Sequence, residues 1–423
     1  MTRRSLTPLA VLSSAAAGAA VLGATLPAAA DGHPPFEVLA TYPVAGEVAE
    51  IVAVAPSGSL LAYTDSAAEA VGFVDLADPA SPAAAGTVPV GGEPTSVAFA
   101  RGGTLALVAV DTSESFTDPS GDLVVVDVRR NETVTVLPLG GQPDAVAVEG
   151  RYAAVALENQ RDEDIEVDGV EGGLPQAPAG ALAVVDLAGQ PGGWTVDAVD
   201  LTGLDGAAFP EDPEPEFVDI RRGVAAVTLQ ENNAVALVDL ATRSVVGSFG
   251  AGEVVRDDAD LEDDGQVSFT QRLVAPREPD AVQWTAAGNL VTADEGDLAA
   301  EPSGGRGWTV FSPEGKVLYA DGSRAERALA DVNRYPDRRS DDKGAELEGV
   351  EVASFRGTQH AFIGSERGDA VLVYDLSDES APVLLQVLPT GDAPEGLLAV
   401  PSRGLLLASN EDDGTISVFG LTR

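Results

Sequence analysis

Cysteine is absent from this chain of 423 residues, so it can form no disulfide bond and offers no thiolate nucleophile. Histidine is almost as scarce, with His33 and His360 as the two examples. We expect His360 to be a core or turn residue rather than a catalytic base. The chain also lacks the G-x-S-x-G pattern of a serine hydrolase, and Gly250-Ala251-Gly252 lacks the third glycine of a phosphate-binding loop. Nucleophilic and nucleotide-dependent catalysis therefore find little support.

Positive charge is the next scarcity. The 25 Lys and Arg residues stand against 68 Asp and Glu residues, which gives a formal net charge of −43 at pH 7. Such a chain repels the phosphates of nucleic acid, so we expect no nucleic-acid partner. The acidity favours cations or cationic partners. Solubility or a high-salt habitat would explain the same charge.

Long apolar runs are absent beyond residues 9–26. Arg3 and Arg4 precede that run, and Ala28-Ala29-Ala30 follows it. A charged start, an apolar middle and a small-residue end are typical of an export signal. We therefore predict a signal peptide at residues 1–30 and a secreted, extracellular mature chain at 31–423 without a membrane span. The T-R-R-S-L stretch at 2–6 leaves both the general secretory and the twin-arginine routes open, and an uncleaved anchor is the alternative.

What the chain does contain is turns, with 46 Gly and 28 Pro residues that divide it into short apolar runs. Short runs bounded by Gly, Pro, Asp or Asn are typical of strands. The pattern is clearest at residues 392–421, where an acidic turn, two apolar runs joined at Gly404, an acidic loop and a third run follow one another. Similar units begin at Glu50, Glu93, Gln142, Glu214, Glu278 and Glu346.

This recurrence predicts the fold class. A repeat of about 40–50 residues with four strands per unit is the signature of a β-propeller, here an all-β chain with seven blades. Residues 36–44 read as a strand without an inner partner, and the last unit lacks an outer strand. The N-terminal strand is therefore predicted to close the seventh blade and leave no exposed edge. A solenoid or a tandem sandwich is the structural alternative.

Several units end in a V-x-V-V-D-L pattern. Its aliphatic residues suit a strand packed between neighbouring blades on both faces. The acid at the strand end is expected to cap the following turn, which makes it structural. These acids are Asp75, Asp127, Asp186, Asp239 and Asp375.

Four segments of the last third resemble a known family. They are T-A-D-E-G-D at 292–297, S-D-D-K-G with E-L-E-G-V at 340–350, F-I-G-S-E-R at 362–367 and P-E-G-L at 394–397. The chain resembles the choice-of-anchor I family of secreted microbial propellers with YVTN/WD40-like repeats. The resemblance implies the fold and export, and it implies no particular chemistry.

Carboxylates concentrate in the turns that enter each inner strand and in the loops that follow each second strand. In a propeller these segments emerge on one face, so we expect an acidic rim around the mouth of the central channel. Packed acids raise one another's pKa unless a cation neutralises them, and oxygen ligands suit Ca²⁺ or Mg²⁺. Solvated acidic loops without a metal are the alternative. The candidate ligands are Asp294, Glu295, Glu348, Glu366, Glu395 and Glu411.

Two insertions read D-x-E-x-D-G, close to the start of a calcium loop. One contains Asp164 and Asp168, and the other contains Asp260 and Asp264. Neither has clear flanking helices, and Gln271 stands where the second loop would need a bidentate Glu. They are candidate Ca²⁺ ligands, with an acidic, mobile insertion as the alternative.

Basic residues cluster once, at residues 324–343. Within this cluster Arg338 and Arg339 are candidates for holding an anion such as phosphate, and a salt-bridged insertion is the alternative. Two functions follow from these features. One is a monomeric, exported binding or scaffold protein with Ca²⁺ on its acidic face and an unidentified extracellular ligand. The other is a metal-dependent extracellular hydrolase, for example of phosphate esters.

Overall fold

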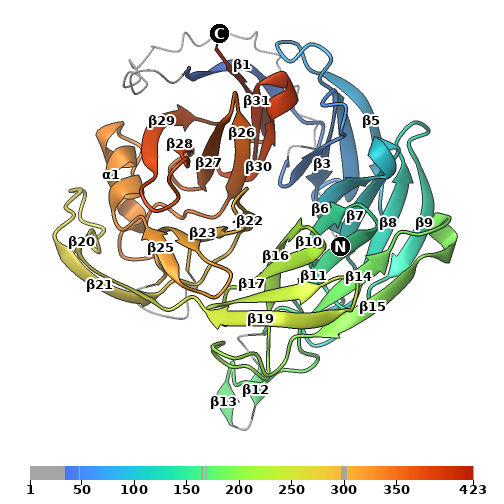
Figure 1. Cartoon of the computed structure of the whole chain (residues 1–423), viewed down its shortest axis with the longest axis horizontal. Helices are drawn as coiled ribbons and strands as arrows, with labels where there is room; N and C mark the ends of the chain where they lie inside the picture. Colours follow the sequence, from blue (N-terminus) through green and yellow to red (C-terminus); the bar gives the residue numbers. More distant parts are fainter. Residues whose placement is uncertain (1–33, 47, 163–164, 168, 297–302, 423) are drawn as a thin grey trace, which may run out of the picture.

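The chain is a seven-bladed β-propeller (Figure 1). The computed structural model describes residues 34–46, 48–162, 165–167, 169–296 and 303–422. Seven antiparallel sheets of four strands each are arranged around a central axis. The all-β class and the seven blades predicted from the repeats are confirmed.

Each blade runs from an inner strand at the channel to an outer strand at the rim. Blade 1 contains β2 (Val52–Val54), β3 (Leu60–Asp65), β4 (Ala70–Asp75) and β5 (Ala83–Pro89). Blade 2 contains β6 (Glu93–Ala100), β7 (Leu105–Asp111), β8 (Gly121–Asp127) and β9 (Glu132–Pro138). Blade 3 contains β10 (Pro143–Glu149), β11 (Tyr152–Leu157), β14 (Ala181–Asp186) and β15 (Thr195–Asp200). Blade 4 contains β16 (Pro215–Arg221), β17 (Val224–Leu229), β18 (Ala234–Asp239) and β19 (Ser244–Gly250).

The remaining blades follow the same order until the chain closes on itself. Blade 5 contains β22 (Val282–Trp284), β23 (Leu290–Asp294), β24 (Gly307–Phe311) and β25 (Val317–Ala320). Blade 6 contains β26 (Val350–Phe355), β27 (Thr358–Ser365), β28 (Ala370–Asp375) and β29 (Val383–Pro389). Blade 7 contains β30 (Pro394–Val400), β31 (Leu405–Asn410), β32 (Thr415–Leu421) and, as its outer strand, β1 (Phe36–Pro43).

Strand β1 closes the ring as predicted. It pairs antiparallel with β32, from Phe36 opposite Leu421 to Pro43 opposite Thr415. The Phe36 backbone N–H donates to Gln386 Oε1 at 3.0 Å, and Gln386 Nε2 donates back to the Phe36 carbonyl at 2.9 Å. The Phe36 ring also meets the edges of Phe355 and Phe362, with centroids 5.1 and 5.5 Å away. The first described strand is therefore fastened to blades 6 and 7.

The sequence pattern explains the layers within a blade. Second and third strands such as β17 and β18 are almost continuously aliphatic, because neighbouring blades cover both of their faces. Outer strands face solvent on one side, as the exposed Val134 and Val136 of β9 show. The strand-end acids cap the next turn, confirming their structural role. A backbone N–H two or three residues further on donates to Asp75, Asp127, Asp186, Asp239 and Asp375.

Two hairpins and several short helices interrupt the repeats. The hairpin strands are β12 (Glu166–Val167) with β13 (Val170–Glu171), and β20 (Glu253–Ala259) with β21 (Gln271–Pro276). The α-helix is α1 (Arg324–Asp331), and the 3-10 turns are η1 (Arg101–Gly103), η2 (Pro191–Gly193), η3 (Asp337–Arg339) and η4 (Pro401–Arg403). None of the described helices is long and apolar enough to span a membrane.

Helix α1 belongs to the insertion between blades 5 and 6, which Arg306 holds in place. This guanidinium is 1 % exposed. It donates to the backbone carbonyls of Asp260, next to the β20–β21 hairpin, and of Ser340 in the insertion, both at 2.9 Å. A buried ion pair of 2.7 Å between Arg256 and Glu326 joins the hairpin to α1. The insertion is thus anchored beside the channel mouth.

Candidate cation-binding site at the channel mouth

One register position in every inner strand points to the channel mouth. In each blade the inner strand has an aliphatic residue that pairs with the second strand, such as Val218 opposite Val227. The residue two positions before it is a carboxylic acid in six of the seven blades. We call these seven residues the inner ring: Glu50, Thr95, Asp144, Glu216, Asp280, Glu348 and Glu395. Because the blades repeat around one axis, equivalent positions form a ring.

A second ring comes from the end of each second strand or from the loop directly after it. These residues are counted from the second-strand member of the same pair. The residue three positions after it is an acid in five blades, a glutamine in one and a serine in one. We call these residues the outer ring: Ser66, Asp111, Glu158, Gln230, Glu295, Glu366 and Glu411. Contacts join the two rings and neighbours within them, as when Gln230 Nε2 donates to Glu295 Oε2 at 2.9 Å.

The rings enclose a cavity of about 580 Å³. Nine carboxylic acids and three basic residues line the cavity, which gives its lining a formal excess of six negative charges. The apolar part of the lining includes Phe217, beside Glu216 of the inner ring. The acids are Asp144, Glu216, Asp280, Glu295, Glu346, Glu348, Glu366, Glu395 and Glu411, and the cations are Arg339, Lys343 and Arg367.

Burial and mutual repulsion disfavour ionisation in the inner ring. Burial, together with nearby carboxylates, raises the pKa of Glu50 to about 7, and burial with the charge of Glu50 raises the pKa of Asp144 to about 7. Burial is also the main reason why the pKa values of Glu216, Asp280 and Glu395 lie well above their usual range. Neighbouring carboxylates raise these pKa values further. A bound cation would favour the ionised forms.

None of the six inner-ring acids forms an ion pair with a cation of the described residues. The Oε2 atoms of Glu216 and Glu395 are buried and, within the same described parts, have no hydrogen-bond partner. Buried carboxylate oxygens without donors are costly, so this wall of the cavity suits a ligand that brings positive charge.

The blade 6 wall is organised differently. Oxygens of Glu346, Glu348 and Glu366 lie within 4.8 Å of one another, close enough to share one metal ion. Burial raises the pKa of Glu366 to about 7 and, with Glu295 and Glu366 nearby, raises the pKa of Glu348 well above its usual range. Burial also acts on Glu346, but its hydrogen bond with Glu366 and the guanidinium of Arg339 outweigh burial and lower the pKa of Glu346.

Three cations neutralise part of this wall. Arg367 Nε lies 2.6 Å from Glu346 Oε2, and its Nη1 lies 2.7 Å from Glu366 Oε1. Arg339 Nε donates to Glu346 Oε1 at 3.0 Å. Lys343 pairs with Glu295. The insertion that carries α1 therefore supplies two of the three positive charges at the channel mouth.

The structure separates the candidate ligands predicted from the sequence. Glu295, Glu348, Glu366, Glu395 and Glu411 line the cavity. Asp294 points into blade 5 instead, where Thr292 Oγ1 and Thr309 Oγ1 donate to it and Arg277 Nε lies 3.8 Å away. Of the anion-binding candidates, Arg339 lines the cavity, whereas Arg338 is exposed and does not.

The two candidate calcium loops contribute no described residue to the cavity lining. Asp164 and Asp168 fall outside the described residues. In the second loop Asp260 Oδ2 accepts from the Ser268 N–H at 2.7 Å, and Asp264 Oδ1 accepts from the Gln266 N–H at 2.8 Å. Among the described acids, Glu346, Glu348 and Glu366 form the one group with converging ligand atoms. The loop at 260–271 is thus closed by hydrogen bonds to its own backbone.

Sequence reasoning missed several residues at the channel mouth. Glu50 and Gln230 were not singled out, although each occupies a ring position that the inner-strand register defines. Arg367 was not expected to hold Glu346 and Glu366. Counting from the aliphatic residue of each inner strand would have found the ring positions. His360 is a core residue as expected, 6 % exposed and stacked on Phe362.

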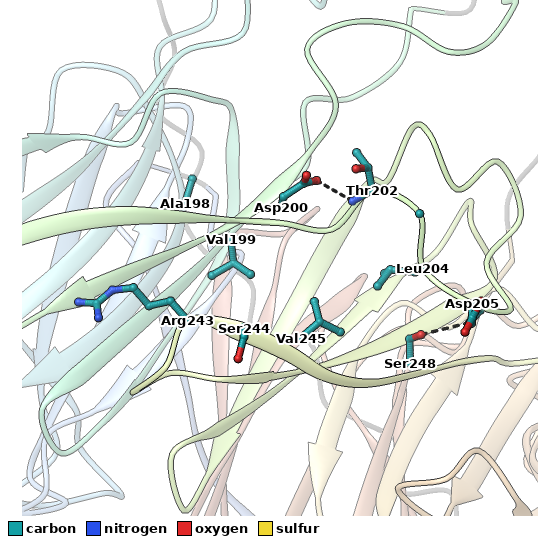
Figure 2. Close-up of a pocket in the computed structure, with 11 residues that line it drawn as sticks. Ala198, Val199, Asp200, Thr202, Leu204, Asp205, Arg243, Ser244, Val245 and Ser248 are labelled. Carbon is teal, nitrogen blue, oxygen red and sulfur yellow. Dashed lines mark hydrogen bonds between the residues drawn. The ribbon is translucent and has the colours of Figure 1, made fainter.

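A groove at the outer rim offers a contrast (Figure 2). It lies between β15 and β19 and has a volume of about 530 Å³. Its polar groups bond within the protein: the Thr202 N–H donates to Asp200 at 2.8 Å, and Ser248 donates to the Asp205 carbonyl at 3.2 Å. Arg243 pairs with Asp197 at 2.8 Å. Two acids and one cation line this groove, so its charge excess is much smaller than that of the channel mouth and it is a weaker candidate.

Comparisons with known proteins agree with this architecture. The family model of the choice-of-anchor I domain matches residues 50–303 and 299–379. Hydrazine synthase from Kuenenia stuttgartiensis superimposes with a TM-score of 0.56 at 17 % identity, covering 89 % of this chain and 96 % of that one. The propeller domain of Cps50 (Swd1) from Myceliophteria thermophila gives a TM-score of 0.57 at 12 % identity, covering 92 % and 100 %. At these identities the two structures support the fold alone. No curated protein matches the chain.

Proposed function

The chain belongs to the choice-of-anchor I domain family, and on that premise we propose that it is an exported binding protein that takes up a divalent cation at its channel mouth. The observation that carries the proposal is the convergence of Glu346, Glu348 and Glu366 within 4.8 Å inside a cavity with a large excess of carboxylates. Carboxylate oxygens are the ligands that Ca²⁺ prefers, so Ca²⁺ is the first cation to test.

The three acids have different roles in this proposal. Glu348 and Glu366 provide ligand oxygens, and because burial raises the pKa of both carboxyl groups, a cation bound between them would favour their ionised forms. Glu346 completes the site while Arg339 and Arg367 fix its carboxylate from behind. The backbone of blade 6 positions all three on either side of the β26–β27 pair.

Export is part of the proposal on different grounds. The charged start, apolar middle and Ala-rich end of residues 1–30 support a signal peptide, and these residues lie outside the described part of the chain. Membership of the choice-of-anchor I domain family supports a secreted or surface location. Fractionating cells that express the full chain tests this part: export predicts a shortened product outside the cytoplasm.

Calorimetric titration tests the cation. The experiment adds CaCl₂ to the metal-free protein at about pH 7.5, and we expect saturable binding that Glu348→Gln with Glu366→Gln weakens at least about tenfold. The matched control is Glu262→Gln with Asp264→Asn, which makes the same charge change in the loop at 260–271. Binding that survives in the Glu348 variant and disappears in the control would move the site to that loop. No saturable binding in wild type would refute the proposal.

A metal-dependent phosphoester hydrolase is the second candidate. The observation in its favour is that Arg339, Lys343 and Arg367 line the same cavity as the three converging acids. A metal held there would activate water, and the cations would hold a phosphate. Turnover of p-nitrophenyl phosphate that requires Ca²⁺ and is lost in Arg339→Met would favour this function. If the protein binds Ca²⁺ but does not hydrolyse p-nitrophenyl phosphate, the result would favour the binding function over the hydrolase.

A further inference from the structure

The part of the cavity lining outside the ion pairs of blade 6 has acceptors without donors. Glu158 of the outer ring is 8 % exposed and adjoins the acids there without lining the cavity itself. It lies near Asp144: burial raises the pKa of Glu158, and the charge of Asp144 raises that pKa further. The buried Oε2 atoms of Glu216 and Glu395 are without partners in the described structure. Blades 3, 4 and 7 thus present Asp144, Glu216 and Glu395 to one cavity without a counterion from the described chain.

The spacing of these acids does not suit a bare metal ion. Ca²⁺ takes six to eight oxygens at roughly 2.3–2.6 Å, so its ligand atoms lie close to one another. In the described structure the one group of three acids that meets this spacing is on blade 6. The cavity, at about 580 Å³, has the volume of a pocket for a small organic molecule.

The supply of positive charge is also uneven around the ring. Arg339, Lys343 and Arg367 are engaged with Glu346, Glu295 and Glu366. Asp144, Glu216 and Glu395 lie in the same cavity without such a partner in the described chain. A ligand for this wall must therefore bring N–H donors and more than one positive charge.

An aromatic ring stands beside these acids. Phe217 follows Glu216 on β16 and lines the cavity. A phenyl ring attracts an ammonium group over its face and also packs against methylene groups. The wall thus combines separated carboxylates with a short apolar surface.

We propose that this wall binds a small organic polyamine, with ammonium groups donating to Asp144, Glu216 and Glu395 and the alkyl chain lying against Phe217. A polyamine bound to Asp144 would also favour the ionised form of the neighbouring Glu158. The site deepens the proposed binding function by naming a second class of ligand, and it does not require the metal on blade 6. The methylene groups of a polyamine would fill cavity volume that a single metal ion does not occupy.

Calorimetric titration with spermidine at about pH 7.5 and physiological salt tests the inference. We expect saturable binding to wild type, weakened at least about tenfold in Asp144→Asn with Glu216→Gln, since each substitution removes a charge-assisted hydrogen bond. The matched control is Glu114→Gln with Glu132→Gln, two exposed glutamates of blade 2, which should change the affinity less than about twofold because exposed charges are screened. The single variant Glu395→Gln provides a second reading if the double variant does not fold.

The outcomes separate this inference from the proposed metal site. Spermidine binding that is equally weak in the control variant would show general attraction to an acidic protein and overturn the site. The polyamine site would also be overturned if the wild-type protein binds Ca²⁺ but no spermidine. Spermidine binding that persists in Glu348→Gln with Glu366→Gln, and fails in the Asp144 variant, is the result expected.

Discussion

At the residue scale, the direction of each side chain decides which acids reach the channel. Asp294 and Glu295 are neighbours, yet Asp294 is bonded inside blade 5 while Glu295 lines the cavity. Arg338 and Arg339 divide in the same way, since only Arg339 reaches the cavity. In an extended segment such as the end of β23, successive side chains point to opposite sides, and in the 3-10 turn η3, which holds Arg338 and Arg339, they point about a third of a turn apart. The sequence located the acidic segments, but it could not tell which neighbour in each pair faces the axis.

The buried acids predict how stability depends on pH. Burial raises the pKa of Glu50 and of Asp144 to about 7 in the folded protein. The carboxyl groups of an unfolded chain have pKa values of about 4. Between these values the folded protein holds more protons than the unfolded chain, so stability falls as the pH rises. Acids with a lowered pKa, such as Asp186 at about 2, titrate below this window.

Thermal unfolding in EDTA measures this effect. We expect the Tm at about pH 5 to exceed the Tm at about pH 8 by at least about 2 °C. Asp144→Asn with Glu216→Gln should reduce that difference, because two titrating groups are gone. A Tm that rises from pH 5 to pH 8 would show that these acids are not repelled in the folded state.

At the element scale, the insertion between blades 5 and 6 supplies cations to the channel mouth and depends on its anchoring. Its helix, α1, was not expected from the sequence, because eight residues carry too little periodicity to identify a helix. Tertiary contacts stabilise it: Ala325 and Leu329 are fully buried, and the Ala325 N–H donates to Asp321 at 2.8 Å. A short helix of this kind is fixed by packing rather than by propensity.

Arg306 offers a test of that anchoring. Arg306→Lys removes the planar fork that reaches the carbonyls of Asp260 and Ser340. We expect faster trypsin cleavage within residues 321–346 and a free energy of unfolding lower by roughly 1–3 kcal/mol, the cost of leaving buried acceptors unpaired. Arg272→Lys is the control, because its ion pair with Asp257 is exposed. Equal cleavage of the two variants would mean that Arg306 does not hold the insertion.

Strand β1 gives a second prediction at this scale. Phe36→Ala removes a ring that is 2 % exposed and contacts Phe355 and Phe362. We expect the free energy of unfolding in urea to fall by about 3–5 kcal/mol. Val38→Ala, at a side chain 57 % exposed in the same strand, should change it by less than about 0.5 kcal/mol. If both variants lose a similar amount of unfolding free energy, the packing of Phe36 is not what holds β1 in blade 7.

At the scale of the whole molecule, the repeat was the most predictable feature. Each blade repeats the same run of turns and aliphatic strands, and β1 fills the one vacant outer position of blade 7. Such local signals specify a propeller because each unit must pack against the next. The site was less predictable, since it exists only where the seven units meet. Arg367 of blade 6 and Arg339 of the insertion converge on Glu346 through the fold alone.

The same repetition explains the chemistry of the channel mouth. One register position, repeated around an axis, gathers six acids into the inner ring. The outer ring adds five more, and Arg339, Lys343 and Arg367 offset part of their charge on one wall. A cation that binds there relieves repulsion contributed by most of the blades. We therefore expect Ca²⁺ to stabilise the entire propeller, because binding to the folded state alone raises its stability.

Anomalous diffraction from crystals soaked in MnCl₂ tests the central claim most directly, because Mn²⁺ takes the same oxygen ligands and scatters anomalously. The predicted result is a peak at the channel mouth beside Glu348 and Glu366, within coordination distance of both carboxylates. A peak confined to the loop at 260–271, or no ordered peak inside the two rings, would contradict the account.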